Sequence, residues 1–353
     1  MKPSRPTVAD IAAYDEIIDV RTPAEFAEDH IPGAINCPVL DNDQRILVGT
    51  LYKQVSPFEA KKIGAALVSE NIARHLKDRF LDRPKSWKPL IYCWRGGDRS
   101  GSMTTIFKAI GWQAGQLDGG YKAWRSHVIA RLEALPEKYS FTVIGGATGS
   151  AKTRILQAIG ALGEQILDLE NLANHKGSVL GVLPDSPQPT QKGFETALML
   201  ALAALDPARP VHVEAESRKI GNLHVPEAVI ARIRSGDFVA VDATLDARVA
   251  FLLKDYDYFL TRPDFLCGRL DTLRTLQSRE TLDRWQQQVR DGDWPMLVRE
   301  LLEQHYDPLY QRSQDRNYTG LQDAGNFATD DLSEDGINRL AATIVQSRTA
   351  QIA

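Results

Sequence analysis

One cysteine, Cys93, stands where a predicted strand meets a glycine-rich loop. The apolar residues Leu90–Tyr92 predict the strand, and Ser100–Ile110 predict a helix after the loop. Gly96 and Gly97 permit the tight curl that turns successive backbone N–H groups inward. A loop of this kind, ending at a helix N-terminus, is an oxyanion-binding site.

Two arginines, Arg95 and Arg99, add positive charge to this loop. The inward N–H groups, the helix N-terminus and Arg99 favour the thiolate of Cys93, which is the nucleophilic form of cysteine. The alternative is a buried structural thiol, as most lone cysteines of intracellular chains are. We predict that Cys93, Arg95 and Arg99 are catalytic and that Gly96 and Gly97 hold the oxyanion.

A second anion-binding pattern follows the apolar strand Phe141–Ile144. Residues 145–153 read GGATGSAKT, a near P-loop in which Ala151 replaces the glycine that normally precedes the lysine. We expect Ala151 to lie at the start of the next helix, where alanine still allows the loop to form. Lys152 is predicted to reach the outer phosphate oxygens, and Thr153 is a candidate Mg²⁺ ligand. The predicted phosphate-binding residues are Gly146, Thr148, Gly149, Ser150, Lys152 and Thr153.

Acidic residues follow two of the later predicted strands. Short apolar runs separated by helical stretches predict a parallel α/β sheet, with strands at residues 165–169, 211–214 and 238–241. The carboxyl ends of parallel strands meet at one sheet edge. Asp168, Glu170, Glu214 and Glu216 are therefore candidates for metal binding or acid–base chemistry, and solvated loop acids are an equal alternative.

The chain has 353 residues, more than one ordinary core accommodates. A charged connector near residues 135–138 separates its two loop regions. After Cys267, leucines at helical spacing alternate with arginines, which predicts helices whose charged face is either solvated or bound to RNA. We predict an N-terminal domain at 1–135, a P-loop domain at 136–265, and a helical region at 266–353 that packs on the P-loop domain.

Charge and cysteine content exclude several classes. A net charge of −4 gives no global basic field, so any nucleic-acid contact must be a local patch. Three scattered cysteines form neither a CxxC pair nor a disulfide framework, and neither metal-ligand spacing nor a redox-cofactor motif occurs. Cys37 and Cys267 are expected to be packing residues. The absence of a signal peptide or long apolar run predicts a soluble cytoplasmic protein without a membrane partner.

Two segments that flank the Cys93 loop resemble the signatures of rhodanese-like domains: residues 17–36 and residues 111–124. The resemblance covers roughly residues 5–130. Cys93 and Arg99 enclose five residues, whereas sulfur-transferring rhodaneses usually have four. The longer loop is similar to that of rhodanese-fold phosphatases and arsenate reductases and suits a tetrahedral phosphorus oxyanion. Tyr92 stands where such phosphatases usually carry histidine, so group transfer is favoured over hydrolysis.

Over nearly its whole length the chain resembles the bacterial tRNA 2-selenouridine synthases. The matching segments beyond the two loops are residues 169–178, 188–195, 213–221 and 306–310. The resemblance implies a tRNA selenotransferase and geranyltransferase acting on wobble 2-thiouridine in the anticodon loop. The sulfur is first geranylated from geranyl diphosphate, and the geranylthio group is then displaced by selenium from selenophosphate. S-alkylation makes this exchange possible, because it turns a poor leaving group into a thiol.

The chemistry of the two donors suggests a hypothesis that assigns one donor to each loop. Selenophosphate suits the Cys93 loop, where Cys93 would accept selenium as a perselenide while Arg95 and Arg99 hold the departing phosphate. Geranyl diphosphate suits the P-loop, where Lys152, Thr153 and Mg²⁺ would neutralise the leaving diphosphate. Selenophosphate synthetase is a candidate partner protein. The candidates for tRNA contact are His175, Lys176, Arg218, Lys219, Tyr306 and Tyr310, and the two tyrosines are equally interpreted as packing residues.

Two other functions remain open at this stage. One is a rhodanese-type sulfurtransferase, or tRNA thiolation enzyme, whose P-loop domain uses a nucleoside triphosphate to activate the uridine. The other is a nucleotide-switched binding module with a silent rhodanese-like scaffold, against which the intact Cys93 loop argues. The sequence does not determine the oligomeric state.

Overall fold

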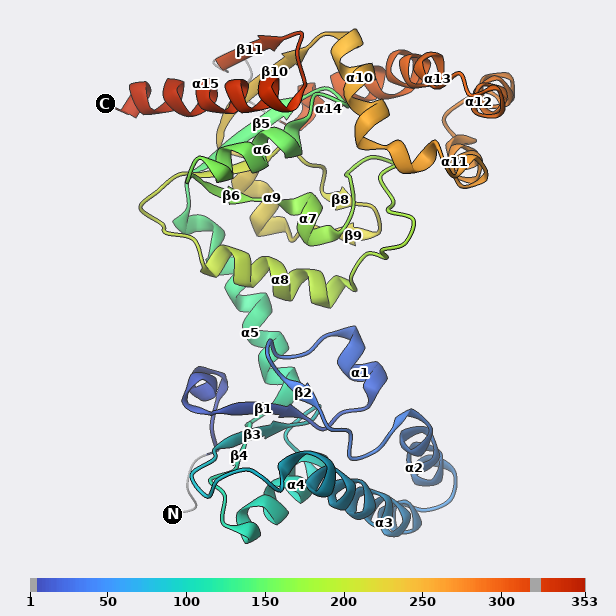
Figure 1. The fold of residues 1–353 in the computed structure, drawn as a ribbon. Coiled ribbons are helices and arrows are strands. Elements are labelled where there is room, and N and C mark those ends of the chain that lie inside the picture. The colour runs from blue at the N-terminus through green and yellow to red at the C-terminus, as the bar shows by residue number, and fades with distance from the viewer. Residues whose placement is uncertain (1–4, 318–324, 353) are drawn as a thin grey trace. The chain divides into compact units, whose positions relative to one another are not determined.

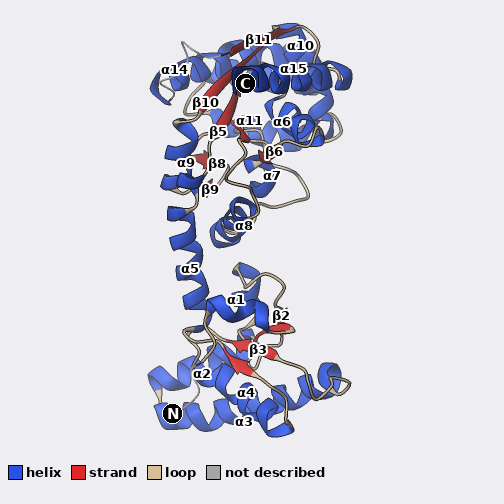
Figure 2. Cartoon of the chain, turned by 90° about the vertical axis from the view of Figure 1, so that its left-hand side faces the viewer, coloured by secondary structure: helices blue, strands red, loops and turns tan. Residues whose placement is uncertain are grey.

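The structure is a computed structural model that describes residues 5–317 and 325–352. The chain divides into two compact units, Met1–Arg131 and Leu132–Ala353, and the boundary falls within helix α5 (Gly120–Ala134). In each unit the strands lie among covering helices (Figure 1, Figure 2). The predicted α/β class is confirmed, since both main sheets are built from parallel strands.

The first unit contains a four-stranded parallel sheet with the order β2-β1-β3-β4. Helices α3 and α4 lie on one face of this sheet, and α1 and α5 lie on the other (Figure 1). The predicted strand before Cys93 is β3, and the predicted helix after the loop is α4. The elements are β1 (Glu16–Asp19), α1 (Pro23–Glu28), β2 (Ile35–Asn36), α2 (Asn42–Gln54), α3 (Pro57–His75), β3 (Pro89–Tyr92), α4 (Asp98–Ile110) and β4 (Gly115–Gln116).

An aromatic cluster holds β3 and α4 in place. Phe107 of α4 packs against Phe80, Trp87 and Trp112, with ring centroids 5.1–5.8 Å apart. All four side chains are buried in the core of this unit, together with Cys37. Burying aromatic side chains of this size is the main contribution to a core of this kind. The cluster therefore fixes the strand and the helix between which the Cys93 loop is held.

The second unit contains a five-stranded parallel sheet with the order β11-β10-β5-β7-β6. Helices α6 and α15 pack together on one face, and α9 packs against β5 on the other (Figure 2). The central strand β5 leads into the P-loop. The first elements are β5 (Phe141–Gly146), α6 (Lys152–Ala161), β6 (Gln165–Leu167), α7 (Leu169–Ala173), α8 (Gln191–Ala203), β7 (Val211–Glu214), β8 (Lys219–Ile220), β9 (Leu223–His224), α9 (Glu227–Arg234) and β10 (Asp237–Ala243).

The remainder of the second unit is mostly helical. The leucine pattern after Cys267 corresponds to a separate apolar cluster in which Leu270, Trp285 and Leu297 are buried. One strand that the helical pattern does not include, β11, adds to the sheet edge beside β10. The elements are α10 (Leu245–Asp255), α11 (Pro263–Leu270), α12 (Arg279–Asp291), α13 (Trp294–Leu301), a short π-helical segment (Leu302–Tyr306), α14 (Asp307–Asn317), β11 (Gly325–Thr329) and α15 (Glu334–Ile352).

The arginines of this helical region are engaged in local contacts. Arg284 pairs with Glu300, Arg274 with Asp271, and Arg279 with Asp283. Such pairs on exposed helices are those of a solvated surface. Among the described residues, no helix is both long enough and apolar enough to cross a membrane.

Candidate active sites

The Cys93 sulfur lies between two hydrogen-bond donors. Its Sγ atom accepts from the backbone N–H of Gly97 at 3.3 Å and from the hydroxyl of Ser100 at 3.2 Å. Hydrogen bonds donated to sulfur stabilise the charged thiolate more than the neutral thiol. Cys93 is only 3% exposed, so little solvent competes with these donors. The structure thus supports the predicted nucleophile and adds Ser100, which the sequence analysis does not single out.

Several carbonyl oxygens of this loop accept hydrogen bonds from donors on the side away from the expected ligand. The oxygens of Cys93 and Trp94 accept from the backbone N–H groups of Tyr121 and Lys122 at 2.8 and 2.9 Å. The Gly96 oxygen accepts from the Arg5 guanidinium at 2.8 Å and from the Gln116 amide at 2.9 Å. Because the carbonyls point outward, the N–H groups are left on the ligand side of the loop.

A glycine from the second rhodanese-type segment allows this close contact. At Gly120, which has φ +57°, a Cβ atom would lie 2.3 Å from the Cys93 oxygen and 2.6 Å from the Gly96 nitrogen. Any other residue would displace the loop, because such distances are far inside van der Waals contact. This explains why residues 117–124 accompany the Cys93 loop in the sequence.

The two predicted catalytic arginines lie in different environments. Arg99 forms a bidentate pair with Glu25 of α1, with N–O distances of 2.7 and 3.2 Å. Burial opposes ionisation of Glu25, but Arg99 nevertheless holds the pKa of that carboxyl below its usual range. Arg95 is exposed. Glu25 therefore orients Arg99, and its place in the first rhodanese-type segment is the signal by which it could have been found.

Tyr92, which stands in place of a histidine, has a structural role. Its hydroxyl accepts the backbone N–H of Ile31 at 3.1 Å. Beside it, the fully buried Arg21 pairs with Asp19 at 2.6 Å and lies over the Tyr121 ring, 3.9 Å from its centroid. Burial is the largest cause of the strongly raised pKa of the Tyr92 hydroxyl. Tyr92 thus remains neutral and positions the strand instead of exchanging protons with a ligand.

The P-loop follows β5 and ends at Ala151, which adopts a left-handed conformation with φ +59°. Ala151 is the N-cap of α6 rather than a residue of the helix, so the expectation that it starts the helix is wrong. An alanine in this conformation costs roughly 1–2 kcal/mol relative to glycine, which the surrounding core must offset. The loop therefore keeps the backbone path that the missing consensus glycine would favour.

Contacts within the P-loop are tight. The Lys152 ammonium donates to the Gly146 oxygen at 2.9 Å. A Cβ atom at Gly146 would lie 2.4 Å from the Ser150 hydroxyl, which is buried and has no hydrogen-bond partner among the described residues. An unpaired buried hydroxyl is costly and indicates a site for a ligand. Ser150 and Lys152 are thus placed as the phosphate-binding hypothesis requires.

The P-loop is also held by the helical region. Arg248 of α10 donates to the Thr148 oxygen at 3.1 Å and forms a bidentate pair with Asp307 at 2.7 and 2.8 Å. Only 7% of the Arg248 side chain is exposed. A buried bidentate pair has well-defined geometry. The segment at 306–310 is therefore linked to the P-loop through Arg248, a residue that the sequence analysis missed.

Three of the four predicted acidic residues gather beside Lys152. Thr153 donates its hydroxyl to Glu170 at 2.7 Å, and the Glu170 backbone N–H donates to Glu214 at 2.9 Å. Burial and the neighbouring Glu216 carboxyl raise the pKa of Glu170 to about 8. Burial also raises the pKa values of Glu214 and Glu216 and lowers that of Lys152. Burial therefore disfavours the ionised form of each of these carboxyl groups and the charged form of Lys152.

The fourth acid, Asp168, has a different role. It caps α7 by accepting the Asn171 backbone N–H at 2.9 Å and also accepts from Gln157 at 3.0 Å. Gly177 is a further residue of the acidic cluster. A Cβ there would lie 2.4 Å from a Glu170 oxygen and 2.7 Å from a Glu216 oxygen, so only glycine leaves this space open.

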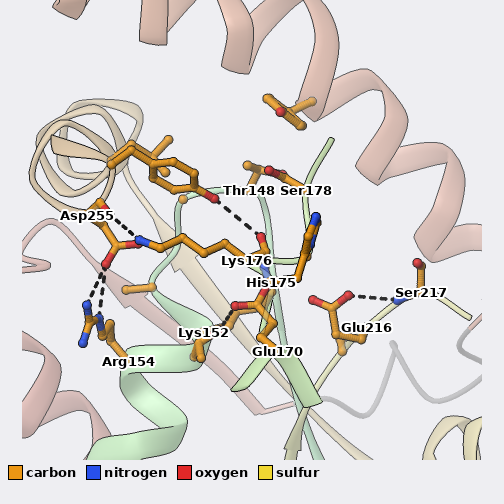
Figure 3. Close-up of a pocket in the computed structure, with 18 of the residues that line it drawn as sticks. Thr148, Lys152, Arg154, Glu170, His175, Lys176, Ser178, Glu216, Ser217 and Asp255 are labelled. Carbon is orange, nitrogen blue, oxygen red and sulfur yellow. Dashed lines mark hydrogen bonds and ion pairs between the residues drawn. The ribbon is translucent and has the colours of Figure 1, made fainter. Parts of the chain in front are cut away.

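A cavity of about 560 Å³ opens above the P-loop. It brings together many of the predicted residues, and Figure 3 shows several of them around it. Lys176 pairs with Asp255 at 2.6 Å, and Asp255 also pairs with Arg154 at 2.9 Å. The predicted residues that line the cavity are Thr148, Gly149, Lys152, Thr153, Glu170, His175, Lys176, Glu216, Tyr306 and Tyr310.

The remaining candidates for tRNA contact differ in accessibility. His175 is buried, and burial lowers its pKa, so its ring is neutral at pH 7. Arg218 and Lys219 are exposed and do not line the cavity, and Arg218 pairs with Glu227 at 3.2 Å. The residues that line the cavity are thus suited to a small anionic ligand, whereas Arg218 and Lys219 are accessible to a larger ligand.

Two protein families match different parts of the chain. Residues 7–127 match the rhodanese-like domain, and residues 139–263 match a domain described as the tRNA 2-selenouridine synthase AAA domain. These ranges contain the Cys93 loop and the P-loop respectively.

Curated relatives extend the similarity over most of the chain. Three proteins named tRNA 2-selenouridine synthase are similar to it. The protein from Nitrosomonas europaea is 34% identical, with 78% of this chain and 73% of the relative covered. That from Hydrogenovibrio crunogenus is 30% identical (88% and 92% covered), and that from Marinobacter nauticus is 31% identical (83% and 87% covered).

Replacing Ser100 with alanine tests the environment of the Cys93 sulfur. Loss of one hydrogen bond to sulfur, worth about 1 kcal/mol, is expected to slow alkylation of Cys93 by iodoacetamide at pH 7 roughly fivefold. Ser102→Ala is the matched control, because the Ser102 hydroxyl lies in the same helix and bonds only to the Asp98 oxygen. Peptide mapping separates Cys93 from Cys37, whose pKa burial raises to about 11. Equal rates in both variants would contradict the role of Ser100.

The acidic cluster predicts a pH-dependent stability. The folded-state pKa of Glu170, about 8, lies above its ordinary value of 4.5, so ionisation destabilises the folded protein as the pH rises from 4.5 to 8. Glu170→Gln removes this ionisation. We expect the melting temperature of the variant minus that of the parent, both measured in EDTA, to be larger at pH 8 than at pH 5. A difference between the two melting temperatures that is independent of pH would show that Glu170 is not a buried, destabilised carboxylate.

Proposed function

This chain belongs to the tRNA 2-selenouridine synthase family, and from that premise we propose how its two loops divide the reaction. The thiocarbonyl sulfur of wobble 2-thiouridine first attacks carbon 1 of geranyl diphosphate at the P-loop, and diphosphate leaves. Selenium derived from selenophosphate at the Cys93 loop then replaces the geranylthio group. The observation that carries this proposal is the presence of two separate oxyanion-binding loops, one in each compact unit. Each donor is a phosphorus oxyanion and requires one such loop.

The role of Cys93 follows from the electron balance of selenophosphate. Selenium is already fully reduced in this donor, so forming a perselenide on Cys93 would force phosphorus to leave as phosphite. Attack of the Cys93 thiolate on phosphorus instead forms an S–P bond, breaks the P–Se bond and releases hydroselenide. Hydroselenide then attacks carbon 2 of the geranylated base and expels geranylthiolate, while water hydrolyses the phosphocysteine to phosphate. We therefore replace the perselenide hypothesis with phosphoryl transfer to Cys93.

The loop around Cys93 suits a phosphoryl group. Its five residues between Cys93 and Arg99 leave room for three oxygens, and the outward carbonyls leave the N–H groups for them. Arg99, oriented by Glu25, supplies positive charge from the end of the loop. Arg95 is exposed and is proposed to contact the donor as it enters.

The P-loop unit supplies the groups for diphosphate. Lys152 and the Ser150 hydroxyl are proposed to bind its oxygens as negative charge develops on the leaving group. We propose that Thr153, Glu170 and Glu216 supply oxygen donors of the kind that Mg²⁺ prefers, and burial raises the pKa of both carboxyl groups, which a bound cation would lower. A bound Mg²⁺ would supply further positive charge for the diphosphate.

For the macromolecular substrate, we propose that Arg218 and Lys219 contact tRNA phosphates. Both are exposed, and Lys219 lies in the small hairpin formed by β8 and β9. Tyr310 lines the cavity, and we propose that its ring stacks on the anticodon base. Selenophosphate reaches the enzyme from the synthetase that makes it, which we propose as the supplying partner.

Two variants separate the half-reactions. Lys152→Ala is expected to reduce geranylation of a 2-thiouridine RNA by geranyl diphosphate at least a hundredfold, because it removes charge from the leaving group, but to leave conversion of pre-geranylated RNA unchanged. Cys93→Ser is expected to give the reverse pattern. Each variant is the control for the other, and both products are resolved by liquid chromatography and mass spectrometry. ATP-dependent sulfur incorporation by the parent protein would instead support a thiolation enzyme.

The same assay tests phosphoryl transfer. Phosphorus NMR of selenophosphate turnover is expected to show phosphate, and rapid quenching in denaturant at neutral to alkaline pH, where the S–P bond survives, is expected to show one phosphoryl group on Cys93. Phosphite as the product would restore the perselenide route.

A further inference from the structure

A second, apolar cavity lies directly beside the one above the P-loop. It has a volume of about 70 Å³ and is formed by α10, α11, α13 and the segment at 178–180. Thr148, Ser178, Leu252, Tyr256 and Tyr306 line both cavities, so the two adjoin at a common border. The walls away from this shared border are apolar, and include Leu180, Phe259, Leu266, Leu297 and Leu301.

The border lies at the anion-binding loop itself. A Cβ atom at Gly149, which has φ +83°, would lie 2.8 Å from the Leu252 side chain. Leu252 thus touches the P-loop backbone and also lines the apolar cavity. A ligand whose anionic group is bound by Lys152 and the P-loop can therefore extend directly past Leu252 into apolar surroundings.

We propose that this cavity binds the distal isoprene unit of an allylic diphosphate whose diphosphate group occupies the P-loop. The proposal rests on the function proposed above and adds where the hydrocarbon chain lies and what limits its length. A nucleotide does not suit the cavity, because a ribose and base would lose hydrogen bonds to water that these walls cannot replace.

The volume sets the expected chain length. One buried water molecule needs a cavity volume of roughly 10–15 Å³. The cavity of about 70 Å³ therefore holds about five water-sized groups, which matches the five carbons of one isoprene unit. The proximal isoprene unit then lies at the shared border near Thr148 and Tyr306, where its allylic carbon is next to the P-loop. Each methylene moved from water into such a cavity raises affinity about fourfold.

The experiment compares ligands on the full-length protein by calorimetry. Geranyl diphosphate is expected to bind at least tenfold more tightly than dimethylallyl diphosphate or inorganic pyrophosphate, and farnesyl diphosphate is expected to gain nothing beyond geranyl. Equal affinity for geranyl diphosphate and pyrophosphate would overturn the proposal.

Two variants test whether the hydrocarbon chain of geranyl diphosphate lies in this cavity. Val298 lines the cavity and is only partly buried, so Val298→Phe fills the space with little effect on the core. It is expected to weaken geranyl diphosphate at least tenfold and to leave pyrophosphate affinity within twofold. Met296→Phe, an exposed change in the same helix, is the control. Leu253→Phe, at a partly buried residue that lines the apolar cavity, is a second filling variant with the same expected pattern, and wild-type geranyl affinity in both would overturn the proposal.

The outcomes distinguish this inference from the function on which it rests. If thiouridine RNA is geranylated but both filling variants bind geranyl diphosphate normally, the cavity assignment fails and the proposed function stands. If geranyl diphosphate neither binds nor reacts while ATP binds, the proposed function fails as well.

Discussion

Both anion-binding loops depend on the same constraint: each curled backbone must have its carbonyl oxygens bonded from outside so that its N–H groups can face a ligand. In the first unit, donors come from the start of α5, from Arg5 and from Gln116. In the second unit, Arg248 of α10 donates to the Thr148 oxygen. The rest of each unit can be understood as the framework that brings these donors to the loop.

The two loops solve the charge problem in different ways. Around Cys93 the charged groups are paired: Arg99 with Glu25, and the buried Arg21 with Asp19. Beside the P-loop, three carboxyl groups lie near the ammonium group of Lys152, and burial raises their pKa values and lowers that of Lys152. The charged groups around the first loop are thus already paired before a ligand binds. Beside the second loop, a cation bound together with the anionic ligand would offset the negative charge of these carboxylates.

The helical region after the P-loop sheet links the anion site to an apolar one. Its leucines and Trp285 form a separate core, which supports α10 and α13. From α10, Arg248 reaches the P-loop and Leu252 reaches the apolar cavity. One helix therefore contributes to both halves of the proposed ligand site. The largely buried Arg248–Asp307 pair, together with the Arg248 bond to Thr148, fixes the position of that helix beside the loop.

The sequence by itself determined the two loops, the strands before them and the fold class, because local spacing of glycines, apolar residues and charged ends depends only on neighbours along the chain. It did not reveal Ser100, Gln116 or Arg248 as loop partners, since a serine, an amide or an arginine carries no signal of its contact, which here is 7, 20 and 100 residues away respectively. The edge strand β11 was not predicted for a similar reason. Residues 325–329 are exposed or partly exposed, and they form a strand because they pair with β10. Only the tertiary structure decided which acids gather beside Lys152 and which, like Asp168, merely cap a helix. Their chemistry depends on burial and on through-space charge, neither of which is a property of sequence order.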